Sequence, residues 1–294
     1  MEADRLTLLG VPIDSVGEAG GTENGPAALR RHLSPGLRDA GDTEIQLRGG
    51  ERDPESGWLD LDDVVRMSVE VRQRVAEITA AGEVPLILGG CCSLLPAALA
   101  GARDSLGEIG LAYLDGHLDL FTGETSPTGE AADMPVAALL GMAPPGLAEA
   151  LEPLPVIEAE QIVLIGARDQ EEIDLIAPMP EGIGIGRIAD REDLREADLA
   201  EAGRSIAGQL TRDGRRFWLH LDLDILDQEA FPATDYLMDD GLTLDELRVL
   251  MAPVASSPGL IGLNLTCFNP DKDPAGRFGR ALADLVEATV ITSK

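Results

Sequence analysis

The sequence is poor in cysteine, histidine and lysine. Three cysteines among 294 residues do not make a disulfide framework, and the adjacent Cys91 and Cys92 are poorly placed to pair with each other. We therefore expect reduced thiols, which are typical of a reducing compartment. No run of eighteen apolar residues and no signal-peptide pattern occurs. These absences predict a cytoplasmic protein with no membrane segment.

Positive charge is scarce as well. Lysine and arginine together number 23 against 53 aspartate and glutamate residues, which gives a formal net charge of -30. Nucleic acid is therefore an unfavourable partner, because phosphate binding needs clustered basic side chains. The acid is spread along the chain, and Lys272 and Lys294 are the only lysines. This composition favours adaptation to high salt, where screening weakens like-charge repulsion; an ordinary acidic cytosolic protein is the alternative.

The sequence does have a regular alternation of short apolar runs and amphipathic stretches. Between residues 61 and 81, apolar side chains recur at helical spacing, and Gly82 is a plausible C-cap. We predict strands at 6–9, 84–88, 109–114, 162–166, 217–225 and 260–267, and further helices at 26–33, 194–210 and 244–251. This alternation is typical of a mostly parallel sheet covered by helices on both faces. We expect residues 1–294 to form a single α/β domain.

Two polar clusters lie at the ends of predicted strands. In extended backbone, residues two apart point to the same side, so each cluster can gather its carboxylates and imidazole. The first cluster contains Asp115, His117 and Asp119, and the second contains His220, Asp222 and Asp224. Ligands of parallel sheets bind at the carboxyl ends of the strands. The position of both clusters therefore indicates a functional site.

The residue types in these clusters favour a metal site. Buried carboxylates are costly unless they are paired or bind metal, and divalent cations would remove the repulsion among neighbouring aspartates. Mixed Asp/His ligands suit Mn²⁺, Zn²⁺, Fe²⁺ or Co²⁺ better than Ca²⁺. Alternatively, each cluster is a loop with capping aspartates and a surface histidine. Metal binding is favoured because two of only three histidines lie within these motifs.

The ordered motifs resemble those of the arginase, agmatinase and formimidoylglutamase family over almost the whole chain. The opening LLGVPIDSVGEAGGTENGPAALR resembles the family's start, and LILGGCCS resembles Gly-Gly-Asp-His-Ser. YLDGHLD resembles Asp-Ala-His-x-Asp, and LHLDLDILD resembles Ser-Phe-Asp-x-Asp-x-x-Asp. TSPTGEAADMP lies where the substrate loop is found, and PATDYLMDDGLT and CFNP resemble the last two motifs.

The resemblance implies a three-layer α/β/α fold and two divalent metal ions, manganese by family, that share a bridging hydroxide. By analogy, two carboxylates bridge the metals and each metal has further ligands of its own. Asp115 and Asp222 would bridge, Cys92 and Asp119 would hold the first metal, and His117 and Asp224 would hold the second.

Several residues depart from the family pattern, and these departures limit what the resemblance implies about the substrate. They are Cys91 and Cys92 in place of an aspartate and a histidine ligand, Glu130 in place of an asparagine that contacts the substrate's carboxylate, Ala132 in place of a proton-shuttling histidine, His220 in place of a serine, Tyr236 in place of a threonine, and Cys267 in place of the glutamate that binds the guanidinium.

Three of these departures have chemical consequences. A thiolate at Cys92 would shift the first metal site towards Zn²⁺ or Fe²⁺, although Cys92 could instead be an inert buried thiol. His220 could restore the lost imidazole, or it could orient Asp119 as a hydrogen-bond donor. Glu130 would repel a substrate carboxylate and attract an amine or guanidinium; a solvated surface acid is the alternative.

We therefore expect a metal-dependent hydrolase of C–N bonds in a linear guanidine or amidine, agmatinase-like rather than arginine-specific, which works as a homo-oligomer. The metal-bridging hydroxide would be the nucleophile, oriented by Asp119 and His220. The small cationic substrate would contact Glu130, Asp133, Tyr236 and Cys267. A non-catalytic, metal-binding family member that binds a ligand or a partner is the main alternative. Cysteine-based amidino chemistry comes last, because no separate general-base histidine is evident.

Overall fold

The fold is known from a computed structural model that describes residues 2–14, 20–45, 47, 50–169 and 184–291. The described part contains one sheet of eight strands in the order β2-β1-β3-β8-β7-β4-β5-β6, and all its pairings are parallel. The strands are β1 (Leu6–Val11), β2 (Arg38–Asp42), β3 (Val84–Gly89), β4 (Ile109–Leu114), β5 (Ile162–Ile165), β6 (Arg187–Ala189), β7 (Arg216–Asp222) and β8 (Leu260–Thr266).

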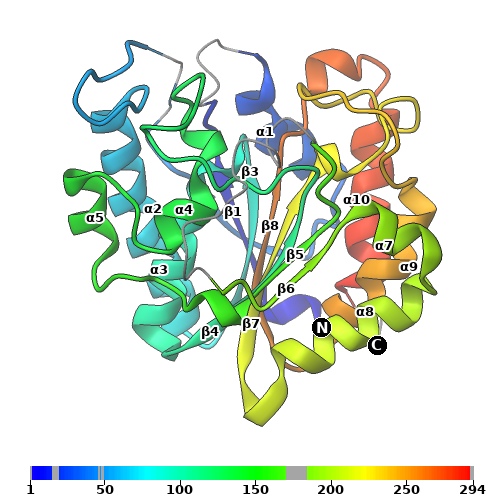
Figure 1. The fold of residues 1–294 in the computed structure, drawn as a ribbon. Helices are drawn as coiled ribbons and strands as arrows, with labels where there is room; N and C mark the ends of the chain where they lie inside the picture. Colours follow the sequence, from blue (N-terminus) through cyan, green and yellow to red (C-terminus); the bar gives the residue numbers. More distant parts are fainter. Residues whose placement is uncertain (1, 15–19, 46, 48–49, 170–183, 292–294) are drawn as a thin grey trace.

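Helices cover both faces of this sheet. The α-helices are α1 (Gly25–Arg30), α2 (Leu61–Ala80), α3 (Leu95–Leu106), α4 (Pro135–Leu139), α5 (Pro145–Leu151), α7 (Arg191–Glu196), α8 (Leu199–Leu210), α9 (Leu244–Ala255) and α10 (Arg277–Thr289). Single 3₁₀ turns are η1 (Ala3–Arg5), η2 (Thr22–Asn24), η3 (Cys92–Leu94), η4 (Ala131–Asp133), η5 (Ala159–Gln161), η6 (Arg212–Gly214), η7 (Leu223–Ile225) and η8 (Pro270–Lys272). In Figure 1, α2, α3 and α5 lie on one side of the sheet, and α8, α9 and α10 lie on the other. The predicted three-layer α/β/α arrangement is confirmed.

Two apolar cores, one on each face, follow from the period-two geometry of the strands. In β7, Phe217, Leu219 and Leu221 pack into the core beneath α8, α9 and α10. Trp218, one residue out of step, packs into the core beneath α2 and α3. His220 lies two residues beyond Trp218 and therefore shares its face of the sheet. The sheet thus carries His220 on the face that α2 and α3 cover.

The helices predicted at 26–33 and 244–251 are observed at Gly25–Arg30 and Leu244–Ala255. Two other predicted elements were wrong in their extent because of aspartates. Residues 194–210 do not form one helix, because Asp198 caps a new helix by accepting a hydrogen bond from the backbone N–H of Glu201 at 3.0 Å. The strand predicted at 217–225 ends at Asp222, whose side chain accepts a hydrogen bond from the Asp224 backbone and starts the η7 turn. Both errors come from aspartates whose side chains bond to nearby backbone.

No helix within the described ranges is both long enough and apolar enough to cross a lipid bilayer.

The fold brings candidate functional residues together at the carboxyl ends of the central strands. Because β3, β8, β7 and β4 are consecutive in a parallel sheet, their carboxyl ends meet at one edge. Residues that follow these strands are therefore brought together, although they are far apart in the sequence.

Candidate metal centre

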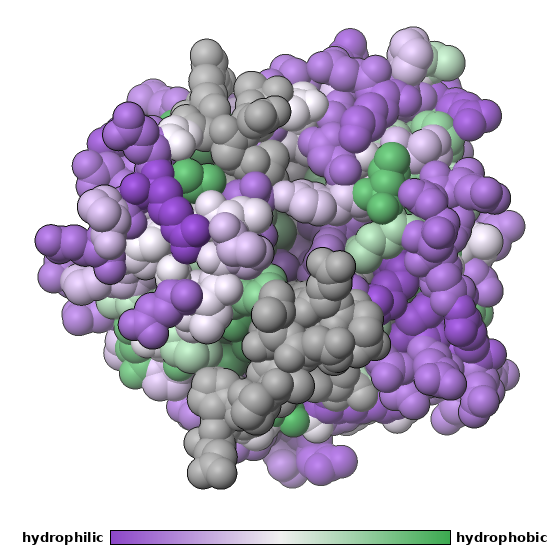
Figure 2. All heavy atoms as spheres, turned by 45° about the horizontal axis from the view of Figure 1, so that its top comes forward, coloured by the Kyte–Doolittle hydropathy of each residue, from purple (hydrophilic) through white to green (hydrophobic). Residues whose placement is uncertain are grey.

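A small cavity opens at the edge where the carboxyl ends of the strands meet. Figure 2 views the molecule with this side turned towards the reader and shows a hollow near its centre, with hydrophilic residues mainly to its right. The cavity holds about 150 Å³, well below the roughly 300–1,000 Å³ typical of pockets for drug-sized ligands. Its lining residues are Cys92, Asp115, His117, Asp119, Phe121, Pro127, Thr128, Ala132, Asp133, Asp169, Asp222, Asp224, Tyr236 and Cys267. The cavity therefore suits a small, polar ligand.

All six predicted metal ligands line this cavity, and neighbouring strands supply five of them. Asp115 and His117 follow β4, while Asp222 ends β7 and Asp224 lies in η7. Cys92 begins η3, directly after the bend at Gly90 and Cys91 that follows β3. Asp119, the sixth, lies farther along the β4 loop in a left-handed backbone conformation, with φ of 52°. The fold thus unites both polar clusters at one site.

The ligand atoms fall into three groups, and within each group they lie within 4.8 Å of one another. The groups are Asp115 with His117 and Asp224, Asp115 with His220 and Asp222, and Cys92 with Asp222 and Cys267. Asp115 and Asp222 each belong to two groups. Shared carboxylates are what a pair of bridged metal ions requires. Asp119 belongs to none of the three groups, and its Oδ2 accepts a hydrogen bond from the Tyr113 hydroxyl.

The electrostatics of the site indicate that positive charge is needed there. Burial, followed by Asp224 and Asp115, raises the pKa of Asp222 well above its usual value. Burial and then Asp115 also raise the pKa of Asp224. Burial opposes a charge on His117, but Asp224 and Asp115 together raise its pKa well above the ordinary range. These pKa shifts mean that bound protons offset the negative charge of the neighbouring carboxylates. A divalent ion can replace those protons.

Asp115 differs from the other two carboxylates. Burial alone would raise its pKa, but the neighbouring imidazoles of His117 and His220 outweigh burial and hold the pKa below its ordinary value. Its Oδ1 accepts a hydrogen bond from the His117 backbone at 2.8 Å. Its Oδ2 is buried and has no hydrogen-bond partner among the described residues. An ionised, buried oxygen without a hydrogen-bond partner suits a divalent cation. The carboxylates and imidazole at this site therefore fit a metal ion.

His220 is completely buried, and a chain of hydrogen bonds sets its tautomer. The indole Nε1 of Trp218 can only donate, and it does so to Asn264 Oδ1 at 2.7 Å. Asn264 therefore presents its Nδ2 donor to His220 Nδ1, also at 2.7 Å. Nδ1 must accept, so Nε2 carries the ring proton. Nε2 lies 3.5 Å from the unpartnered Oδ2 of Asp115.

Three of the four predicted substrate residues, Asp133, Tyr236 and Cys267, line the cavity. Glu130 accepts a hydrogen bond from the hydroxyl of Tyr236, which is 37% exposed at the rim. Burial and then Asp133 and Asp14 raise the pKa of Glu130, although Tyr236 opposes this. The Asp133 carboxylate accepts hydrogen bonds from Ser126 and Thr128 at 2.7 and 2.6 Å. Glu130 itself is not among the lining residues and reaches the cavity through Tyr236.

Sequence reasoning missed three residues of this site. Asp169 lines the cavity and lies 3.6 Å from His117 Nε2. Asn264 forms a hydrogen bond with His220, and Tyr113 forms one with Asp119. A signal for Asp169 was present, because it follows a predicted buried strand just as Asp115 does. Asn264 and Tyr113 lie inside apolar strand runs. Only the register of the strands, in which Tyr113 pairs with His220 and His220 with Asn264, brings them to the site.

Comparison with known proteins places this geometry in a family. The model of the arginase family matches residues 4–291. The arginase of Brevibacillus brevis is 28% identical over 293 residues, covering 96% of each chain. The solved arginase of Bacillus caldovelox superposes with a TM-score of 0.87 at 26% identity over 99% of each chain. Formimidoylglutamase from Bacillus subtilis, with a TM-score of 0.76 and 20% identity over 99% of this chain and 87% of its own, shares the fold.

Proposed function

The chain belongs to the arginase family, and from this membership and the cavity we propose that it hydrolyses C–N bonds in a small linear guanidine or amidine with two divalent metal ions. The observation that carries the proposal is the set of ligand groups that share Asp115 and Asp222. When bound, divalent ions lower the pKa of water towards neutrality and stabilise developing negative charge. The other steps depend on the protein's own side chains.

Each cluster has a role in this proposal. Asp115 and Asp222 would bridge the two ions, and His117 and Asp224 would complete the second site. Asp119 lies beside the reacting centre, where its carboxylate, held by Tyr113, would orient the attacking water. The Nε2 of His220 lies 3.5 Å from Asp115 Oδ2, so His220 would influence the position of that carboxylate rather than touch the substrate.

The charge of the cavity supports a cationic substrate. Among the described lining residues there is no lysine or arginine, and Asp133 and Asp169 add to the carboxylates of the metal groups. A substrate carboxylate would find no lysine or arginine among the described lining residues and would be repelled by Glu130 near the rim. The buried thiol of Cys267 offers no carboxylate for a guanidinium. We therefore propose an agmatinase-like preference over arginine.

The test is urea release from agmatine, from simpler guanidines and from arginine, with Mn²⁺, Zn²⁺, Fe²⁺ and Co²⁺ supplied separately under reducing conditions. We expect substrates without an α-carboxylate to be preferred. Glu130→Gln should reduce that preference by up to about fivefold, because a partly exposed charge contact is worth roughly 1 kcal/mol at most. Robust arginine turnover by the unmodified protein would contradict the substrate choice. No turnover of any substrate would favour the non-catalytic alternative.

A further inference from the structure

We propose that Cys92, Cys267 and Asp222 together bind one of the metal ions, as a thiolate site that selects Zn²⁺ or another thiophilic ion over Mn²⁺. The inference rests on the proposed function, because it takes the same cavity as the metal centre. It goes further by making Cys267 a metal ligand. It also separates the two metal positions by their chemistry, since His117, Asp115 and Asp224 supply only nitrogen and oxygen.

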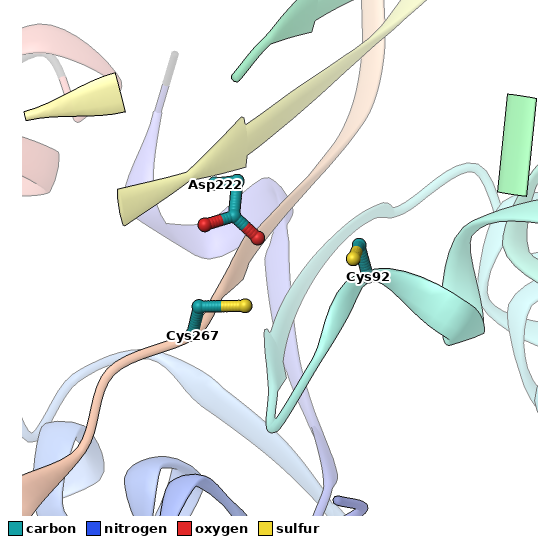
Figure 3. A group of neighbouring side chains, drawn as sticks. All are labelled: Cys92, Asp222 and Cys267. Atoms are coloured by element: carbon teal, nitrogen blue, oxygen red, sulfur yellow. The ribbon is translucent and has the colours of Figure 1, made fainter. Parts of the chain in front are cut away.

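Three strand ends bring these side chains together. Cys92 follows β3, Cys267 follows β8 and Asp222 ends β7, and these strands are consecutive in the sheet. The two sulfur atoms and a carboxylate oxygen lie within 4.8 Å of one another. Figure 3 shows the Cys267 sulfur turned towards Cys92 and the Asp222 carboxylate directed at the same space. The geometry is that of three convergent donors.

Local contacts hold the donors in place. Asp222 Oδ2 accepts a hydrogen bond from Thr266 Oγ1 at 2.8 Å, and its Oδ1 accepts one from the Asp224 backbone at 3.0 Å. Cys267 has φ of 67°, an uncommon conformation for a residue with a side chain, and its N–H donates to Gly90 at 2.7 Å. These contacts fix the Asp222 carboxylate and the backbone of Cys267 before any ion binds.

The hydrogen-bond chain through Asn264 excludes His220 as the competing ligand. Its Nδ1 accepts from Asn264 and its Nε2 bears the proton, so neither nitrogen has a lone pair free for a metal. The group of Asp115, His220 and Asp222 can therefore contribute only its two carboxylates. The remaining group that contains Asp222 is the thiol pair. Three protein ligands with a fourth position open to water are also the usual arrangement of catalytic zinc.

The chemistry balances without a co-reactant. Each thiol loses a proton to solvent when the ion binds, because thiolate is the ligand form. Cys92 donates to the carbonyl of Ala132 at 3.3 Å, and that hydrogen bond is given up on binding. Two thiolates and a carboxylate favour zinc over manganese, since soft sulfur ligands discriminate against hard ions.

The chain offers a matched control for this proposal. Cys91 is the neighbour of Cys92 and is equally buried, but it packs in the core beneath α2 and α3 and is not among the residues that line the cavity. Its sulfur lies 3.1 Å from the Ser93 hydroxyl. A Cys91→Ser variant therefore removes a buried thiol from the same turn and leaves the proposed ligands intact.

The test uses cobalt as a spectroscopic probe. The full chain, reduced and loaded anaerobically with Co²⁺, should show near-ultraviolet thiolate-to-cobalt charge-transfer absorption. Cys92→Ser and Cys267→Ser should each lose about half of that absorption, and Cys91→Ser should keep it. Unchanged absorption in Cys267→Ser would overturn the proposal. Equal loss in Cys91→Ser would overturn it as well.

A second measurement needs no variant. X-ray absorption at the zinc edge, with one equivalent of Zn²⁺ bound, should show two sulfur neighbours at about 2.3 Å. A first shell of only nitrogen and oxygen would overturn the thiolate site. If the protein hydrolyses guanidines but the zinc has no sulfur neighbours, the thiolate site is wrong and the proposed function stands. If sulfur binds zinc but no substrate is hydrolysed, the thiolate site stands and the proposed function is contradicted.

Discussion

Replacing Asn264 with leucine should destabilise the fold by more than the loss of one hydrogen bond. Asn264 is fully buried, and its amide joins Trp218 Nε1 to His220 Nδ1 at 2.7 Å on each side. Leucine has a similar shape but leaves both buried groups without a partner. Each such group costs about 1–3 kcal/mol. We therefore expect the free energy of unfolding to fall by about 2–6 kcal/mol.

The assay is urea unfolding of metal-free protein in high salt, so that metal binding does not contribute to the difference. Thr43→Val is the matched control, because the Thr43 hydroxyl is buried and has no hydrogen-bond partner in the described part of the chain. That change should cost little. A loss below about 1 kcal/mol in Asn264→Leu would refute the accounting of both hydrogen bonds. Nitrogen NMR of the unmodified protein should also show His220 protonated on Nε2; a proton on Nδ1 would refute the tautomer.

Three further predictions follow from the same contacts. Asp222→Ala should release metal, because this buried carboxylate belongs to two ligand groups; elemental analysis that finds full occupancy would contradict its assignment. Asp169→Asn should weaken metal binding by about tenfold or more, because Asp169 lies 3.6 Å from His117 Nε2 and would orient that ring; competition with a chelator measures the affinity. Raising KCl to molar levels should raise the thermal unfolding midpoint of this chain of net charge -30, because salt at about 1 M shortens the range of charge repulsion to about 3 Å. Sucrose serves as the uncharged control. A midpoint that is flat or falls with KCl would leave the acidic composition without this explanation.

The layered fold was predictable because buried parallel strands have a strong apolar signal. Six of the eight strands coincide with runs of mostly apolar, buried residues. The other two lie at the edges of the sheet, where the signal weakens. The outer strand Arg38–Asp42 has the sequence RDAGD and no buried residue, so nothing in its composition distinguishes it from a loop. It forms because its backbone pairs with β1, which is a property of the assembled sheet.

The candidate ligands were predictable in identity but not in arrangement. Acid and imidazole groups after buried runs indicated a metal centre, and the structure brings them into one cavity. The sequence left open whether Cys92 or His220 replaces the lost ligand. In our proposal that choice depends on Trp218 and Asn264, which are 46 residues apart and meet through the pairing of β7 with β8. Which side chain donates and which accepts between neighbouring strands cannot be predicted from the sequence of one strand.

We propose that the residues at 92, 220 and 267 form one coupled change. In the resembling family, the position of Cys92 holds a histidine and that of Cys267 a glutamate. A glutamate beside Asp222 and a new thiolate would add a further negative charge to a fully buried group, which burial strongly opposes. A second thiol would avoid that penalty, since it is neutral without metal and, in the proposed site, a ligand with it. In the same proposal His220 would act on Asp115 and would not compete for the ion. Without that glutamate, the proposed cationic substrate would depend on other carboxylates, such as Asp133 in the cavity and Glu130 behind Tyr236, and selection among guanidines would then occur nearer the rim.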